Sequence, residues 1–226
     1  MNLIKIYTFI IAIMTSSLCF TAQASDIPLY PTGPSQDSAF IRFINGTGKN
    51  LTVTAGGSKA KIALEVNKPV SPYYPVASKE KITGEFNDGT LTSSISLYVK
   101  AGEFTTAVAF TNGGTMKQVI FKEEPNDFNA LKSSLAFYNQ SSGECTQAGL
   151  VVTDRDVPLF EKVLSGTLKR RLINPVNISV KLICNGKSTG KILALGELQA
   201  GQRYSIFAVP DANNIRIFFA TDTIAR

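Results

Sequence analysis

Phe40-Ile41-Arg42-Phe43-Ile44-Asn45 is the stretch that decides the fold class of this chain. Its apolar side chains form a short run without helical spacing, which is typical of a β-strand that ends at an Asn-Gly turn. Similar runs recur along the chain, and we expect strands at Leu51–Thr54, Leu91–Val99, Thr105–Phe110, Lys117–Phe121, Ser134–Tyr138, Gly149–Thr153, Ile178–Ile183, Tyr204–Val209 and Ile215–Ala220. Further turn signals separate them, at Asp88-Gly89, Asn112-Gly113-Gly114 and Asn185-Gly186. The sequence therefore predicts an all-β fold.

The same stretch returns later in the chain. Phe43-Ile44-Asn45 recurs 94 residues on as Phe137-Tyr138-Asn139, and Ala101-Gly102 recurs 99 residues on as Ala200-Gly201. Self-similarity at a fixed offset indicates repeated structural units. We expect two tandem copies of a small β-sandwich, Ig-like or jelly-roll-like, and the alternative is chance similarity among the strands of one larger barrel.

Charge and proline interrupt the strand pattern between the two copies, at Glu123-Glu124-Pro125-Asn126-Asp127. We read this segment as a solvated linker. The expected organisation is a signal peptide at 1–24, a proline-rich arm at 25–38, a first sandwich at 39–122, a linker at 123–131 and a second sandwich at 132–226.

The first residues have the three regions of a secretory signal. Lys5 is the basic start, Ile6–Phe20 is the apolar run, and Ala22-Gln23-Ala24 is the cleavage site. A membrane anchor is the alternative, but polar residues break the run. A lipoprotein would be acylated at Cys19, where the preceding Leu18 is too bulky for that processing. We expect cleavage and export to the periplasm.

Basic residues outnumber acidic ones, with 23 Lys and Arg against 17 Asp and Glu and a net charge of +6. A moderate positive charge favours an anionic polysaccharide, an anionic lipid or an acidic partner, although it also suits an ordinary soluble surface. The export signal and the lack of a recognisable binding motif argue against nucleic acid as a partner.

The chain contains no histidine. This excludes Ser-His-Asp and Cys-His nucleophilic arrangements and zinc sites that need imidazole. Glu123 and Glu124 do not form a glycosidase pair, because adjacent residues of a strand point to opposite faces. We therefore expect no catalytic residue, no metal site and no cofactor.

Removal of the signal leaves two cysteines, Cys145 and Cys184. An even pair in an oxidising compartment predicts a disulfide, and two buried free thiols are the alternative. Two cysteines are too few for a four-cysteine metal site.

Two segments are candidate binding sites. Tyr73-Tyr74 lies between two prolines and could stack on a sugar ring, or could serve as a packing anchor. Lys169-Arg170-Arg171 is the densest basic run and could pair with carboxylates, or could be a solvated face.

Three segments resemble a known family. They are Leu29-Tyr30-Pro31 followed by Ser38–Asn45, the junction Phe121–Pro125, and Arg171–Val180 with its Asn174-Pro175-Val176. They are similar to the periplasmic alginate O-acetylation protein family AlgF, in the same order and over essentially the whole mature chain. The chain departs from that family in a longer middle section, Ala60–Gly84, and in the Cys145–Cys184 bond.

The resemblance implies a non-catalytic accessory protein needed for O-acetylation of an exopolysaccharide, with alginate as the expected polymer. Its partners would be a periplasmic acetyltransferase and a membrane O-acyltransferase, and it adds Asn174 and Pro175 to the candidate contacts. A carbohydrate-binding module for an anionic polysaccharide is the alternative. An acetyl-relay enzyme with an acetylated serine is the third hypothesis, and the missing histidine disfavours it.

Overall fold

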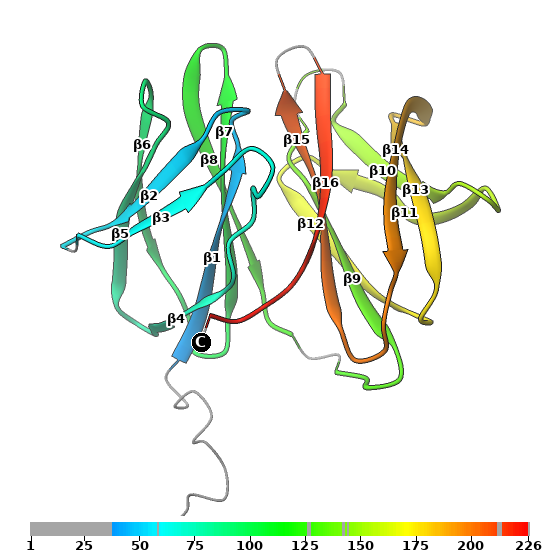
Figure 1. The fold of residues 1–226 in the computed structure, drawn as a ribbon, viewed down its shortest axis with the longest axis horizontal. Helices are drawn as coiled ribbons and strands as arrows, with labels where there is room; N and C mark the ends of the chain where they lie inside the picture. The colour runs from blue at the N-terminus through cyan, green and yellow to red at the C-terminus, as the bar shows by residue number, and fades with distance from the viewer. Residues whose placement is uncertain are drawn as a thin grey trace, which may run out of the picture. The chain divides into compact units, whose positions relative to one another are not determined.

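The computed structural model describes residues 38–57, 59–125, 128–141, 143, 145–211 and 214–225, so the expected signal peptide and nearly all of the expected arm lie outside the described residues. Residues 34–226 form one compact unit. Its described residues contain sixteen strands, eight in each half of the chain. Figure 1 shows how they are arranged. The first half contains β1 (Ser38–Gly46), β2 (Leu51–Ala55), β3 (Lys61–Leu64), β4 (Tyr74–Ala77), β5 (Lys81–Asn87), β6 (Thr92–Tyr98), β7 (Phe104–Asn112) and β8 (Thr115–Glu123). The second contains β9 (Ser133–Asn139), β10 (Gln147–Val152), β11 (Val157–Leu164), β12 (Thr167–Ile173), β13 (Asn177–Cys184), β14 (Lys187–Glu197), β15 (Arg203–Asp211) and β16 (Asn214–Thr221).

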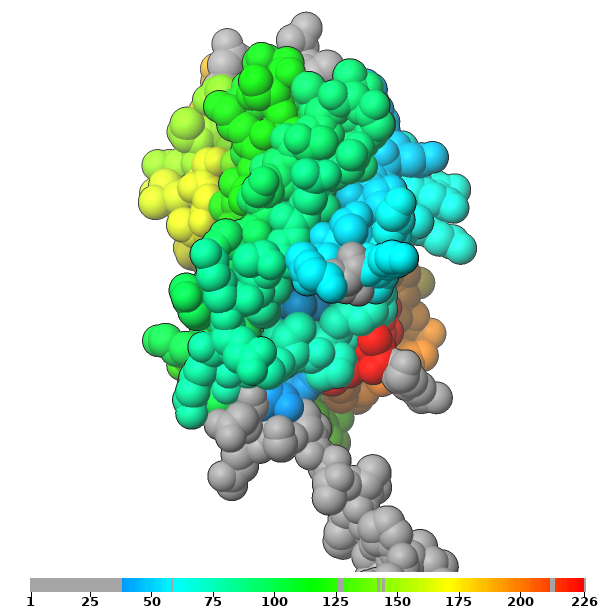
Figure 2. All heavy atoms as spheres, turned by 90° about the vertical axis from the view of Figure 1, so that its left-hand side faces the viewer, coloured from blue at the N-terminus to red at the C-terminus, as the bar shows by residue number. Residues whose placement is uncertain are grey.

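The two halves have the same topology. The first pairs its strands in the orders β4-β1-β7-β8 and β3-β2-β5-β6, and the second in the orders β12-β9-β15-β16 and β11-β10-β13-β14. Strand β1 runs parallel to β7, and β9 runs parallel to β15. The prediction of an all-β chain with two copies of one β-sandwich is therefore confirmed. Figure 2 looks onto the β3-β2-β5-β6 sheet of the first copy.

The repeated asparagine explains part of the sequence similarity. Asn45 is the last residue but one of β1, and Asn139 is the last residue of β9. Each donates its side-chain amide to the third strand of its copy, to the Leu64 oxygen at 2.9 Å and to the Val163 oxygen at 2.8 Å. Each also accepts a hydrogen bond from the backbone N–H two residues on, at 3.0 and 2.9 Å. One side chain thus fixes the same turn in both copies.

The repeated Ala-Gly pair also has one role. Gly102 and Gly201 have φ of 75° and 74°, which a residue with a Cβ adopts only with strain. Their N–H groups bond to the Ser38 oxygen at 2.8 Å and the Lys132 oxygen at 2.9 Å. These turns lead into β7 and β15, so the chain enters both strands in the same way.

Each sandwich has its own apolar core. The first core gathers around Phe43, Val53 and Phe86, and the second around Phe137, Leu150 and Leu182. Strands β1 and β9 are buried on both faces. One face of each strand packs on the core of its own sandwich. The other faces meet in a third apolar cluster shared by the two halves, formed by Ile44, Val108, Phe121, Ala136, Tyr138, Phe207 and Val209.

The C-terminal segment crosses from the second sandwich to the first. After β16 the chain runs back towards β4 (Figure 1), where Ile224 bridges Tyr73. The N–H of Tyr73 bonds to the Thr223 oxygen at 2.7 Å, and the N–H of Ala225 bonds to the Tyr73 oxygen at 2.8 Å. The expected second domain, 132–226, therefore ends with a strap that pairs with the first sandwich. Within the described residues, no helix has the length and apolar character needed to cross a membrane.

Candidate functional site

A buried ionic network lies between the two sandwiches. Arg42 of β1 is fully buried, and its Nη1 lies 2.7 Å from Oδ1 of Asp222, just beyond β16. Its Nη2 donates to Ser205 Oγ at 2.8 Å and its Nε to Thr106 Oγ1 at 2.9 Å. Its guanidinium carbon also lies 4.4 Å from the centre of the Tyr73 ring. One side chain from the first sandwich is thus held by groups from both.

A second arginine completes the network from the other side. Arg170 of β12 binds Glu123, the last residue of β8, with Nε 2.8 Å from Oε1 and Nη2 3.1 Å from Oε2. Its Nη2 also reaches Asp222 Oδ2 at 3.2 Å, and the Tyr138 hydroxyl donates to Glu123 Oε2 at 2.6 Å. The side chains of Arg170 and Glu123 are both 8% exposed. Bidentate pairing in a dry setting requires both partners, since either charge alone would be buried without compensation.

The pKa values in this network follow from burial opposed by pairing. Burial alone would raise the pKa of the Asp222 carboxyl, but the nearby Arg42 and Arg170 charges hold it below its ordinary value. Burial acts in the same direction on Glu123, where the hydrogen bond and charge of Arg170 lower the pKa. Burial opposes the charged form of Arg42 too, yet Asp222 raises its pKa above the ordinary value. The network is therefore ionised near neutral pH.

These positions change the interpretation of several predicted residues. Tyr73 is 2% exposed and lies against Arg42, so it is not placed to stack on a sugar ring from solvent. Arg170 pairs with internal carboxylates, and Glu123 belongs to β8 and is buried there, so the solvated-linker interpretation is wrong for Glu123. Tyr74, the first residue of β4, packs against the first core instead, because neighbouring residues of an extended segment point to opposite faces.

The remaining basic residues of the predicted run bind backbone oxygens. Lys169 Nζ donates to the Glu161 oxygen at 2.8 Å and Arg171 Nη1 to the Leu159 oxygen at 2.7 Å. Both thereby fasten β12 to β11, the neighbouring edge strand of the other sheet. The run is not one basic surface, because successive side chains of a strand point to opposite faces.

Asn174 and Pro175 lie in the exposed turn between β12 and β13. The Oδ1 of Asn174 accepts a hydrogen bond from Lys132 Nζ. This turn stays accessible to a partner.

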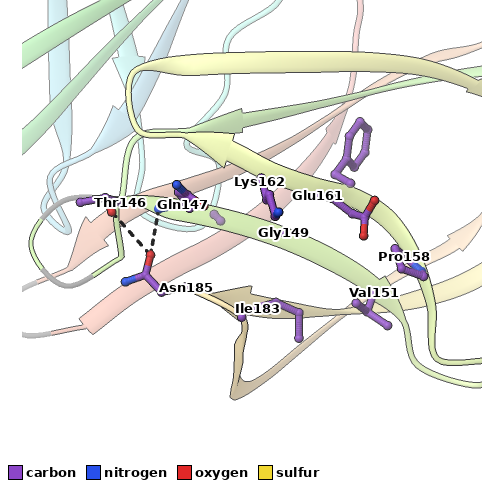
Figure 3. Close-up of a pocket in the computed structure, with 12 residues that line it drawn as sticks. Thr146, Gln147, Gly149, Val151, Pro158, Glu161, Lys162, Ile183 and Asn185 are labelled. Carbon is purple, nitrogen blue, oxygen red and sulfur yellow. Dashed lines mark hydrogen bonds between the residues drawn. The ribbon is translucent and has the colours of Figure 1, made fainter.

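The strongest surface candidate was not foreseen from the sequence. It is a hollow of about 470 Å³ on the outer face of the β11-β10-β13-β14 sheet, which we call the outer hollow (Figure 3). Its lining mixes polar and apolar groups: Thr146, Gln147, Ala148, Gly149, Val151, Pro158, Phe160, Glu161, Lys162, Ile183, Asn185 and Gly186.

Gly149 makes room for the outer hollow. A Cβ on it would lie 2.9 Å from the Phe160 oxygen, so only glycine fits there without a shift. The register of β11 slips opposite this glycine, and Lys162 has a φ of 48°. A bulge of this kind redirects side chains, and here it places Glu161 and Lys162 at the rim.

The base of the outer hollow is braced on one side. Asn185 Oδ1 accepts hydrogen bonds from Gln147 N at 3.1 Å and from Thr146 Oγ1 at 3.5 Å (Figure 3). A disulfide joins Cys145 to Cys184 next to it, with the Cα atoms 5.2 Å apart. The arrangement offers one cation, one carboxylate and amide groups beside an apolar wall, which suits noncovalent binding of an extended polar chain. Among the described residues, no group of three or more acidic or cysteine side chains is placed to hold a metal ion.

The first sandwich has a corresponding hollow of about 400 Å³ on its outer sheet. Thr52 pairs with Asn87 there, as Gly149 pairs with Ile183 in the second. Apart from Gly89, its lining residues have polar side chains: Asn50, Thr52, Thr54, Lys61, Asn87 and Asp88. The duplication therefore supplies a matched control surface for the outer hollow.

No protein-family model matches the sequence, and no curated protein matches it. Among solved structures, the chain is similar to the C-terminal domain of AlgF from P. aeruginosa, at 17% identity over 40% of this chain and 98% of that one, with a TM-score of 0.34. It is also similar to a carbohydrate-binding module of family CBM26 from Eubacterium rectale, crystallised with maltoheptaose, at 10% identity over 80% of this chain and 96% of that one, with a TM-score of 0.25. A third is a putative cell adhesion protein from Bacteroides uniformis, at 8% identity over 85% of this chain and 100% of that one, with a TM-score of 0.30. At these identities and scores, none of the three likenesses carries an argument about what this chain binds.

Proposed function

We propose that this chain is a non-catalytic periplasmic accessory protein in O-acetylation of an exopolysaccharide, with alginate as the expected polymer. It acts as an adaptor that holds a periplasmic acetyltransferase, or the membrane O-acyltransferase, near the polymer. The proposal rests on the sequence segments that resemble AlgF, which come from both sandwiches, and on the geometry of the connection between the sandwiches.

The observation that carries the adaptor role is the buried pairing of Arg42 and Arg170 with Asp222 and Glu123. An adaptor must keep its binding surfaces in a fixed relation, and a paired, desolvated network favours one docking geometry over others that leave a charge unpaired. The two outer sheets are thus held as parts of one body. We assign the partner contact to the outer hollow of the second sandwich.

The test is site-specific photo-crosslinking in cells. A photoreactive residue replaces Val151 in the outer hollow, and the control carries it at Thr52 in the polar hollow of the first sandwich. We expect the Val151 position to capture a polysaccharide acetyltransferase or the membrane O-acyltransferase and the Thr52 position to capture neither. Equal capture at both positions, or none at Val151 while polymer acetylation is normal, would contradict the proposal.

A polysaccharide-binding module remains the second candidate, because Lys162 lies at the rim of an apolar wall and can pair with a uronate carboxylate. Calorimetry of the purified protein with polymannuronate separates the two. Direct binding that weakens with salt and with Lys162→Glu supports the module. Absence of binding, together with a captured enzyme, supports the adaptor.

A further inference from the structure

An apolar pocket of about 270 Å³ lies inside the first sandwich, and we call it the inner pocket. Both sheets line it: Ile41, Phe43, Val53, Thr54, Ala55, Ala60, Ile62, Tyr74, Val76, Ile82, Thr83, Gly84 and Ile95. Figure 2 looks into this region, where the blue of β1 is visible between the cyan β2–β3 turn and the teal segment of β4 and β5. The proposed function makes no use of this pocket.

The inner pocket exists because the first sandwich has smaller side chains than the second at matching positions. Ala55 pairs with Gly84 in the first copy, whereas Val152 pairs with Val180 in the second. A Cβ on Gly84 would lie 2.7 Å from the Thr54 oxygen, so the pairing of β2 with β5 at this position requires glycine.

A further difference in side-chain size lies in the edge strands, β3 of the first copy and β11 of the second. Ile62 pairs with Val53, and the residue in its place in the second copy is Phe160, which pairs with Leu150. Phe160 is 5% exposed and packs 5.8 Å, ring to ring, from Phe137. The second copy therefore fills the volume that the first leaves open.

The lining determines what the inner pocket accepts. None of its lining side chains is charged, and the polar ones are those of Thr54, Thr83 and Tyr74. Its volume exceeds the roughly 150 Å³ of a dry apolar cavity that binds benzene and lies below the ≈ 300 Å³ of the smallest drug-sized pockets. One alkyl chain fits such a space between two packed sheets.

The surroundings of the mouth favour an anionic head group. Lys59 and Lys81 are exposed and adjoin the lining residues Ala60 and Ile82 in the sequence, whereas Lys61 lines the polar hollow of the outer sheet and Lys79 lines a separate pocket. Long lysine stems can bring their ammonium groups to a ligand at the rim. We propose that the inner pocket binds a single-chain anionic amphiphile such as a free fatty acid, with the alkyl chain inside and the carboxylate beside Lys59 and Lys81.

The experiment is a titration of the purified protein with decanoate, followed by amide and methyl NMR shifts. We expect saturable shifts in Ile and Val methyl groups of the first sandwich, and NOEs from them to the alkyl chain. Ile62→Phe, which copies the second sandwich, should weaken binding at least tenfold. Ala55→Val is the second pocket-filling variant, and Thr52→Val on the outer face of the same strand should leave binding unchanged.

Head-group chemistry is tested with ligands of equal chain length. Decanoate should bind at least severalfold more tightly than decyltrimethylammonium, and Lys59→Gln with Lys81→Gln should reduce that preference. Equal binding to wild type and Ile62→Phe, no shifts with decanoate, or tighter binding of the cationic ligand would each overturn the proposal. A negative result here leaves the crosslinking test of the adaptor role unaffected, because the capturing position of that test, Val151, lies in the second sandwich.

Discussion

The two sandwiches share every strand pairing but differ in how their interiors are filled and closed. The second has a disulfide and a core with Phe160, whereas the first has the inner pocket and Ile62 at the matching position. Topology is thus retained while volume changes, because a sandwich needs its pairing register and its alternation of faces more than any one side chain. The comparison shows which copy has spare room and which is packed for stability.

At the interface between the copies, the two acidic residues occupy equivalent positions of the repeat, whereas the two arginines do not. Glu123 is the last residue of β8, and Asp222, 99 residues later, comes directly after β16. Each carboxylate pairs with an arginine of the other sandwich. The arginines are not equivalent, because Arg42 aligns with Ala136, which itself pairs with Arg170. The two acids are therefore equivalent by position in the repeat, but the arginines that they bind come from different strands, β1 and β12.

The largest change in the free energy of unfolding should come from a substitution at Asp222. Asp222→Asn leaves the buried Arg42 without a counter-charge, and we expect a loss of about 3–5 kcal/mol in the free energy of unfolding. Glu123→Gln should cost less, because Arg170 retains Asp222. Urea denaturation of both variants measures the difference, and equal losses would mean that the two acids are interchangeable.

Low pH should protonate Asp222 and Glu123 and so remove their ion pairs with the two arginines. The pKa values of Asp222 and Glu123 are lowered in the folded state, so their contribution is complete above the unfolded-state values of about 4 and disappears as pH falls through the folded-state values. Unfolding free energies measured from neutral pH downwards should stay level to about pH 5 and then decrease. A constant value down to about pH 3 would contradict the assignment.

The disulfide should stabilise the second sandwich and not the first. Replacing Cys145 and Cys184 with serine removes a cross-link over 39 residues, and we expect a loss of about 2–4 kcal/mol. Hydrogen exchange should show the loss in β10 and β13. Increased exchange in β2 and β5 of the first sandwich would show instead that the copies unfold as one unit.

The smallest effect should come from making the first core resemble the second. Ile62→Phe should stabilise the chain by about 0.5–2 kcal/mol if the ring enters the inner pocket as Phe160 fills its own core. The reciprocal Phe160→Ile should destabilise it by leaving a void. Thermal unfolding of the pair checks this, and a destabilising Ile62→Phe would mean that the pocket cannot accept a ring.

Several elements could be read from local pattern and several could not. The strands at Phe40–Asn45 and Tyr204–Val209 were predictable because most of their residues are apolar and turn residues follow them. Strands β3 and β4, which lie within Ala60–Gly84, and β5, which begins there, were missed, since strands with exposed faces carry few apolar residues. Strands β11, β12 and β14 were not predicted either. The outer hollow had no sequence signal beyond Gly149, because a bulge in the neighbouring strand shapes it.

By itself the sequence determined the all-β class, the duplication and the hairpin turns, because alternation, turn residues and an offset of 94–99 residues are local or repeated features. Only the tertiary structure decided that Tyr73, Arg170 and Glu123 are internal. Arg42 and Asp222 meet across 180 residues, and no local pattern encodes that contact. The reason is physical: a strand fixes which side chains share a face, but the packing of one sandwich on the other decides which face is buried.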